Sequence, residues 1–97
     1  MMRLFRKPVS FEWDQGNKDK NLVKHKVTDE ECEETFFDSD KKVANTLVKI
    51  KGENRYLLIG ATKTERLLFI VFTVREQKIR VISARDLNKK ERNLYDQ

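Results

Sequence analysis

Cysteine, proline, glycine and histidine are all scarce in this chain of 97 residues, which holds one cysteine, one proline, three glycines and one histidine. The lone cysteine, Cys32, excludes an internal disulfide. No cluster of His, Cys, Asp and Glu has metal-ligand spacing, so we expect neither a metal site nor a cofactor. No run approaches the ~18 consecutive apolar residues that a membrane helix needs. The basic N-terminus lacks the apolar core of a signal peptide, and we therefore expect a cytoplasmic protein without membrane contact.

Charge is what the chain has in abundance. Charged residues make up 38% of the sequence, as do hydrophobic residues, and the net charge is +5. Residues 1–50 hold ten Lys or Arg against ten Asp or Glu, whereas residues 51–97 hold eleven against six. Residues 28–40 carry seven acids and no base. A basic C-terminal half favours an anionic partner such as nucleic acid.

The N-terminal half predicts one short strand and two helices. Apolar and polar residues alternate over Val9–Trp13, which is typical of a strand. Asp14 is a suitable N-cap for a helix that runs to about His25. Thr28 and Glu31 then form a capping-box pattern that opens a second helix from about Asp29 to Phe37.

The C-terminal half predicts an antiparallel meander followed by one helix. A weak strand (41–50), a confident strand (55–61) and two strands joined by a turn near Glu76-Gln77 (67–74 and 78–85) precede a helix that runs from a second capping box at Asn88 to Tyr95. The order indicates a single α+β domain over residues 1–97, with residues 1–10 as a basic extension. About four strands form its sheet, and the two N-terminal helices and the C-terminal helix pack on it. Phe36, Phe37, Phe69 and Phe72 are expected in the core, and Cys32 is expected to be a small buried hydrophobe.

Arginines mark the margins of the strongest strands. Arg66, Arg75, Arg80 and Arg85 are candidates for phosphate binding, because a planar guanidinium can contact two phosphate oxygens. The alternative is that they are solvated margin residues, or that one pairs with Glu53 or Glu76. Arg80 is favoured because a charge is unusual in the middle of a strand. Arg85 could equally brace the C-terminal helix.

Other side chains could complete an RNA-cleaving site. His25 is the natural proton carrier at neutral pH, or else a residue that ends a helix. Glu53 could act as a base, orient an arginine, or be a turn carboxylate. Tyr56 could stack on an RNA base. Arg55, its neighbour in the sequence, is also predicted to bind RNA. Lys18 and Lys24 would add salt-dependent RNA affinity from a solvated face.

Spaced motifs along the chain resemble the BrnT family of toxins. They comprise Phe11-Glu12-Trp13-Asp14, Lys24-His25-Lys26-Val27, Gly52-Glu53-Asn54-Arg55-Tyr56, Arg66-Leu67-Leu68-Phe69 and Arg80-Val81-Ile82-Ser83-Ala84-Arg85. The resemblance implies a RelE-like α+β ribonuclease that arrests growth. It also implies a BrnA-like ribbon–helix–helix antitoxin that forms a heterotetramer with the toxin and binds promoter DNA. Glu65 stands where the family pattern leads us to expect glycine.

The resemblance and the residues together predict an endoribonuclease that works without a metal ion. Its predicted catalytic residues are Arg80, Arg66, Glu53 and His25, and its predicted RNA-binding residues are Arg55, Arg75, Arg85, Lys18, Lys24 and Tyr56. Two alternatives remain open from composition alone. One is a nucleic-acid-binding module without turnover, and the other is a regulatory protein whose surface receives an antitoxin.

Overall fold

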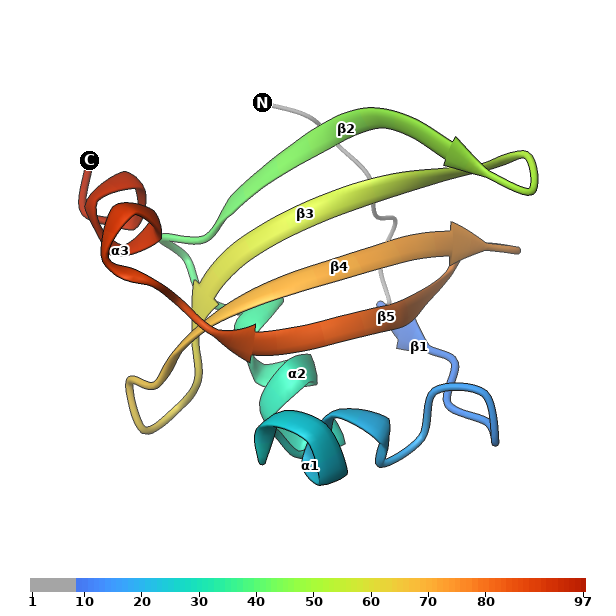
Figure 1. The fold of residues 1–97 in the computed structure, drawn as a ribbon, viewed down its shortest axis with the longest axis horizontal. Helices are drawn as coiled ribbons and strands as arrows, with labels where there is room; N and C mark the ends of the chain where they lie inside the picture. The colour runs from blue at the N-terminus through green and yellow to red at the C-terminus, as the bar shows by residue number, and fades with distance from the viewer. Residues whose placement is uncertain (1–8) are drawn as a thin grey trace.

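The computed structural model describes residues 9–97, so most of the predicted basic extension lies outside the described residues. Five strands and three helices make up the described part (Figure 1). Their bounds, in chain order, are β1 (Ser10–Phe11), α1 (Lys20–His25), α2 (Asp29–Thr35), β2 (Lys42–Ile50), β3 (Glu53–Ala61), β4 (Leu67–Arg75), β5 (Lys78–Asp86) and α3 (Lys89–Tyr95). The predicted α+β class is confirmed.

One sheet of strand order β1-β5-β4-β3-β2 organises the molecule. Strands β2 to β5 form the predicted antiparallel meander. Strand β1 adds a fifth strand, which pairs parallel to β5 with Ser10 opposite Lys78. The chain passes through α1, α2 and three strands between these two partners, which is the kind of long connection that a parallel pair requires.

The hairpin that joins β4 to β5 turns at Glu76 and Gln77, as predicted. Both residues have positive φ angles, 49° and 66°, which is the backbone of the two-residue turn that matches strand twist. Farther along the hairpin the register shifts, so that Val71 faces Ser83 while Phe72 faces Val81. The extra residue on β5 is a bulge, and a bulge increases the local twist of the sheet.

The two capping boxes form as predicted, but the first helix is shorter than expected. The side chains of Thr28 and Asn88 each accept a hydrogen bond from a backbone N–H three residues on, and the glutamates there reciprocate. Helix α1 begins at Lys20, not after Asp14. Asp14 instead closes a turn by accepting a hydrogen bond from the Gly16 N–H, and Asp19, with φ of 55°, prevents that turn from continuing into α1.

Helices α1 and α2 lie against one face of the sheet, and α3 lies beyond the strand ends (Figure 1). The core between helices and sheet contains Phe36 and Phe72, whose rings meet edge to face at 5.0 Å between centroids. The prediction that Phe37 is buried is wrong, because 68% of it is exposed. Helix α2 ends at Thr35, so Phe37 falls outside its buried stripe. Phe69 is only half-buried, since it alternates with Leu68 and faces away from the helices.

Candidate functional site

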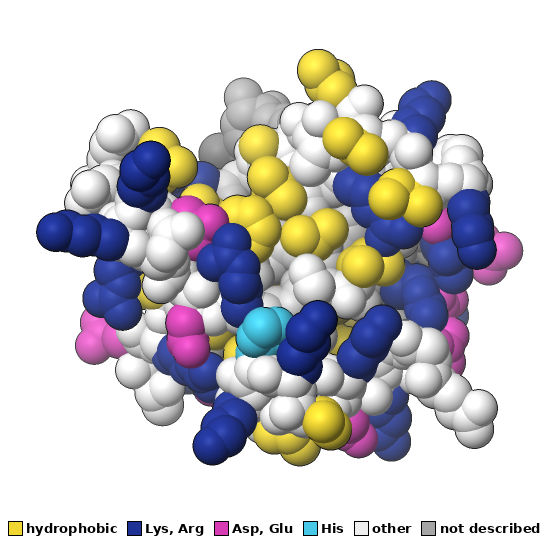
Figure 2. All heavy atoms as spheres, viewed as in Figure 1, with side chains coloured by type: hydrophobic (Ala, Val, Ile, Leu, Met, Phe, Trp, Pro, Cys, Tyr) yellow, Lys and Arg dark blue, Asp and Glu magenta, His cyan; other side chains and the backbone are white. Residues whose placement is uncertain are grey.

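The face of the sheet turned away from α1 and α2 has an apolar centre. Alternation along β3 and β4 places Leu57 and Ile59 opposite Val71 and Phe69 on this face. None of the three helices of the described part covers it (Figure 1). Figure 2 shows that hydrophobic side chains gather in the middle of this face and that Lys and Arg side chains surround them. We call this surface the open face.

Arg80 lies at the β5 margin of the open face and is held by two carboxylates. Its guanidinium donates to both carboxylate oxygens of Asp14, at 2.7 and 2.9 Å, and to Glu12 at 3.0 Å. Only 11% of its side chain is exposed. A Cβ at Gly16 would lie 2.7 Å from the Arg80 Nη2 atom, so glycine leaves the room that this arrangement needs. The hydrogen bond from Arg80 lowers the pKa of Asp14.

Arg75 and Glu53 pair across the neighbouring strand ends. Arg75 donates to both oxygens of Glu53, with Nη2 to Oε1 at 2.9 Å, and its Nη1 lies 3.9 Å from Glu12. The side-chain hydrogen bond from Arg75 lowers the pKa of Glu53. A carboxylate whose charged form is stabilised in this way is a weaker proton acceptor. The geometry therefore favours the prediction that Glu53 orients an arginine over the prediction that it is the base.

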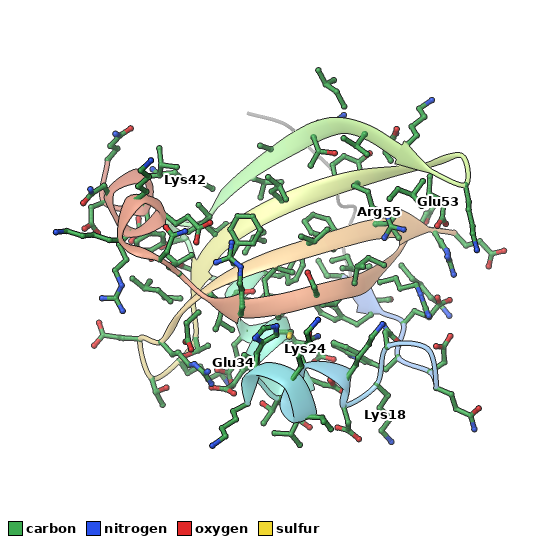
Figure 3. All side chains as sticks on the ribbon, in the orientation of Figure 1. Lys18, Lys24, Glu34, Lys42, Glu53 and Arg55 are labelled. Atoms are coloured by element: carbon green, nitrogen blue, oxygen red, sulfur yellow. The ribbon has the colours of Figure 1, made fainter. Side chains whose placement is uncertain are left out.

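Arg55 differs from these arginines because no hydrogen bond or ion pair fixes its guanidinium to a carboxylate within the described part of the chain. It extends from β3 over the open face near Glu53, as the labels in Figure 3 indicate. Its Nε and Nη1 atoms are buried, and neither makes a hydrogen bond within residues 9–97. Buried polar atoms are usually paired, so an unpaired buried guanidinium needs an explanation. Because these two nitrogens have almost no accessible surface, an anionic ligand on the open face can become their acceptor only when the Arg55 side chain reorients.

Arg66 lies at the opposite end of β4, and its guanidinium joins three elements. It donates to Glu31 of α2 at 3.2 Å, to Asp86 at the end of β5 at 2.8 Å, and to the Lys26 carbonyl oxygen at 2.9 Å. The nine residue steps from Arg66 to Arg75 span about 30 Å of extended strand. The structure therefore does not bring Arg66 together with Arg75 and Arg80.

Arg85 lies near the C-terminal end of β5, where it faces Phe69 of β4. Its guanidinium lies over the Phe69 ring, 4.3 Å from the centroid, and makes a two-pronged pair with Glu91 of α3 at 2.8 Å for each bond. Glu91 is also the residue that completes the capping box of α3. Arg85 thus braces the C-terminal helix, which was one of its two predicted roles, and it still presents a cation beside the apolar centre.

The remaining predicted residues do not all lie on the open face. His25 ends α1, and Figure 2 shows the histidine at the border of the apolar patch. Lys18 and Lys24 are exposed below the sheet (Figure 3). Tyr56 stacks on Phe72 with 5.4 Å between ring centroids, so its ring belongs to the core side.

Two kinds of functional residue escaped the sequence reasoning. Glu12 and Asp14 hold Arg80 from 68 and 66 residues away, so no local pattern could pair them. The requirement for glycine at position 16, beside the Arg80 guanidinium, was also not predicted, although a glycine two residues after an aspartate is a turn signal. Conversely, no group of three His, Cys, Asp or Glu side chains in the described part of the chain could hold a metal ion. No helix among the described residues is long and apolar enough to cross a membrane.

The geometry defines a small α+β protein that presents an apolar patch rimmed by cations. Comparison with protein families finds a match to the ribonuclease toxin BrnT of type II toxin–antitoxin systems, over residues 13–91. The curated proteins compared with the chain contain no match. Because the match covers most of the sequence, the chain belongs to the BrnT family of ribonuclease toxins.

Proposed function

We propose that this chain is a metal-independent endoribonuclease that binds its RNA substrate across the open face. The observation that carries the proposal is the unpaired, partly buried guanidinium of Arg55. A buried charged donor without an acceptor is costly, and a bound ligand that supplies the acceptor removes this cost. A phosphate oxygen is a suitable acceptor for a guanidinium. The family's description as a ribonuclease toxin supports the same substrate class.

The arginines around Arg55 have a second role in this proposal. Arg75 and Arg80 are fixed by Glu53 and Asp14, and preorganised cations stabilise charge that develops on a phosphate without further reorganisation. Glu53 acts as a positioning residue for Arg75. This division of roles needs no metal ion, since the arginines themselves supply the positive charge.

The proton carrier is assigned to His25 and the peripheral contacts to Lys18, Lys24 and Arg85. His25 borders the same face, and an imidazole can exchange protons at neutral pH. The distance along β4 separates Arg66 from this group. We therefore propose that Arg66 supports the site by fixing α2 to β5 and does not contact the scissile phosphate.

The biological setting follows from the family. A type II toxin is held by a protein antitoxin, and we propose a BrnA-like ribbon–helix–helix partner that forms a heterotetramer and binds promoter DNA. Cleavage of RNA would then inhibit translation and growth when the partner is lost. We place this action in the cytoplasm, where messenger RNA is available.

The test is cleavage of EDTA-treated RNA by the purified chain, with and without ribosomes. We expect the wild type to cut, Arg55→Met to lose about 10- to 100-fold in rate, and the matched control Arg92→Met to stay within about twofold. His25→Gln should reduce the rate and flatten its dependence on pH near neutrality. Circular dichroism checks that each variant folds.

Other outcomes would overturn the proposal. Cleavage that vanishes with EDTA and returns with Mg²⁺ would refute metal independence. RNA binding without cleavage, also in the presence of ribosomes, would leave a nucleic-acid-binding module. That alternative has one observation in its favour, namely that the pKa of Glu53 is lowered and the carboxylate is a poor base.

A further inference from the structure

A second surface, away from the open face, forms a groove of about 850 Å³. Its walls come from the outer side of α2, the turn that follows it, the loop between β3 and β4, and α3. Residues from these four segments include Glu34, Phe37, Thr62 and Tyr95. We call this surface the acidic groove.

The carboxylates of the acidic groove form no salt bridges among the described residues. Six of them line it, against a single lysine: Glu30, Glu33, Glu34, Asp38, Asp40 and Glu65, with Lys63. No salt bridge joins any of the six to a Lys or Arg within residues 9–97. By contrast, each of the four arginines at the sheet margins holds a carboxylate. Like charges this close repel one another, and cations from outside the chain would relieve the repulsion.

Several of these carboxylates are positioned by neutral donors. Glu33 accepts from the Trp13 indole at 2.7 Å, and Glu34 accepts from the Lys63 backbone N–H at 2.9 Å. Asp38 accepts from the Tyr95 hydroxyl at 2.6 Å. Neutral donors therefore hold these three charges in place without neutralising them, although the nearby charge of Lys41 also stabilises ionised Asp38. A basic partner would meet a preorganised surface.

Phe37 gives the acidic groove an apolar contact point. The ring is 68% exposed although it lies among charged side chains, and its only described ring contact is an edge approach to Phe11 at 6.5 Å. A large exposed aromatic beside a groove is the kind of residue that anchors protein interfaces. The excess of carboxylates repels nucleic acid and favours a basic protein segment as the partner of this groove.

We propose that the acidic groove receives a basic segment of the antitoxin, with an apolar side chain of that segment packed on Phe37. This inference rests on the antitoxin partner proposed above and adds the place and the chemistry of its contact. Lys and Arg side chains of the segment would pair with free carboxylates such as Glu30. Because the groove and the open face are separate surfaces, contact at the groove can be lost without loss of RNA cleavage.

The test measures binding of fluorescent peptides that tile the small protein encoded by the reading frame adjacent to that of this chain. We expect one basic peptide to bind the full-length wild-type chain, and we expect Phe37→Ser and Glu30→Lys each to weaken its binding at least tenfold, a change of about 1.4 kcal/mol. The matched controls are Val23→Ser, which removes another exposed apolar side chain, and Glu76→Lys, which reverses a charge outside the groove. Both controls should bind as the wild type does.

RNA cleavage by the same variants separates this proposal from the proposed enzymatic function. Phe37→Ser and Glu30→Lys should cut RNA at the wild-type rate if the chain cuts RNA at all, and the peptide result stands even if it does not. The proposal is overturned if no peptide binds the wild type, or if only Arg55→Met weakens binding. It is also overturned if sedimentation shows a dimer of the chain that Phe37→Ser dissociates, since a second copy would then cover the groove.

Discussion

Replacing Arg55 with methionine should move stability and RNA affinity in opposite directions. Methionine keeps a long apolar stem but removes the guanidinium whose Nε and Nη1 atoms are buried without partners. A buried unsatisfied donor costs roughly 1–3 kcal/mol. Its removal should therefore raise the free energy of unfolding by about 1 kcal/mol, after allowance for the partial exposure of the side chain.

The same change should weaken RNA binding. Hydrogen bonds to a charged group contribute about 1.5–3 kcal/mol, which corresponds to a loss of about 10- to 150-fold in affinity. Loss of one phosphate contact should also reduce the slope of log K against log salt concentration by about 0.7 for single-stranded RNA. A nonspecific change in fold would not produce this shift in slope.

Both quantities can be measured on one preparation. Urea unfolding is followed by the fluorescence of Trp13, the only tryptophan, whose indole is bonded to Glu33. Affinity is measured by anisotropy of labelled RNA at several salt concentrations. The reasoning is refuted if Arg55→Met lowers stability by more than about 1 kcal/mol and leaves RNA affinity unchanged, because Arg55 would then be a packing residue.

Three further predictions concern the framework and the ionic groups. Gly60→Ala should lower the free energy of unfolding, measured in urea, by about 1–3 kcal/mol. The Cβ of the new alanine would lie 2.9 Å from the Thr35 carbonyl oxygen and would push α2 away from β3. Unchanged stability would mean that α2 adjusts freely. Stability should be full at pH 7 and fall as the pH drops below about 4, because hydrogen bonds from arginines lower the pKa of the carboxyl groups of Asp14, Glu53, Asp86 and Glu91. The unfolded chain therefore binds more protons in acid than the folded chain does, and acid destabilises the fold. Burial raises the pKa of Asp29, which opposes this loss of stability. Comparing urea midpoints at pH 7 and pH 3 shows whether stability falls in acid. Burial also raises the pKa of Cys32 to about 12, so little reactive thiolate forms at pH 8. The thiol should therefore resist iodoacetamide at pH 8 until urea unfolds the chain. Rapid labelling of the folded chain would contradict this prediction.

Local signals explain why most of the fold could be predicted. The capping boxes at Thr28 and Asn88 and the turn at Glu76-Gln77 depend on residues within four positions of one another. The failures have equally local causes. The left-handed backbone at Asp19 separates the Asp14 turn from α1, and the end of α2 at Thr35 leaves Phe37 outside the core. A left-handed aspartate has no sequence signal as clear as glycine.

The sequence could predict which residues are candidates for the site but not how they are arranged, because the geometry depends on pairs of residues far apart in the chain. Arg80 meets Asp14 across 66 positions, and Arg75 meets Glu53 across 22. Sequence reasoning could count these arginines but could not assign a carboxylate to each. The same limit applies to Arg55, since the property that distinguishes it is the absence of a partner among the described residues.

The pairing of arginines has a consequence for how the toxin distinguishes its partners. Fixed pairs at the sheet margins keep positive charge in place, while the paired carboxylates weaken its long-range field. On the function proposed above, RNA affinity should therefore depend most on Arg55, whose Nε and Nη1 atoms have no hydrogen-bond partner among residues 9–97. The acidic groove has the opposite arrangement, in which the carboxylates lie without cationic partners among residues 9–97. RNA is repelled where a basic segment is attracted, and the reverse holds on the open face. If both proposals hold, charge directs the two partners to different surfaces, and we expect an antitoxin that blocks cleavage to reach the open face with a second, differently charged segment.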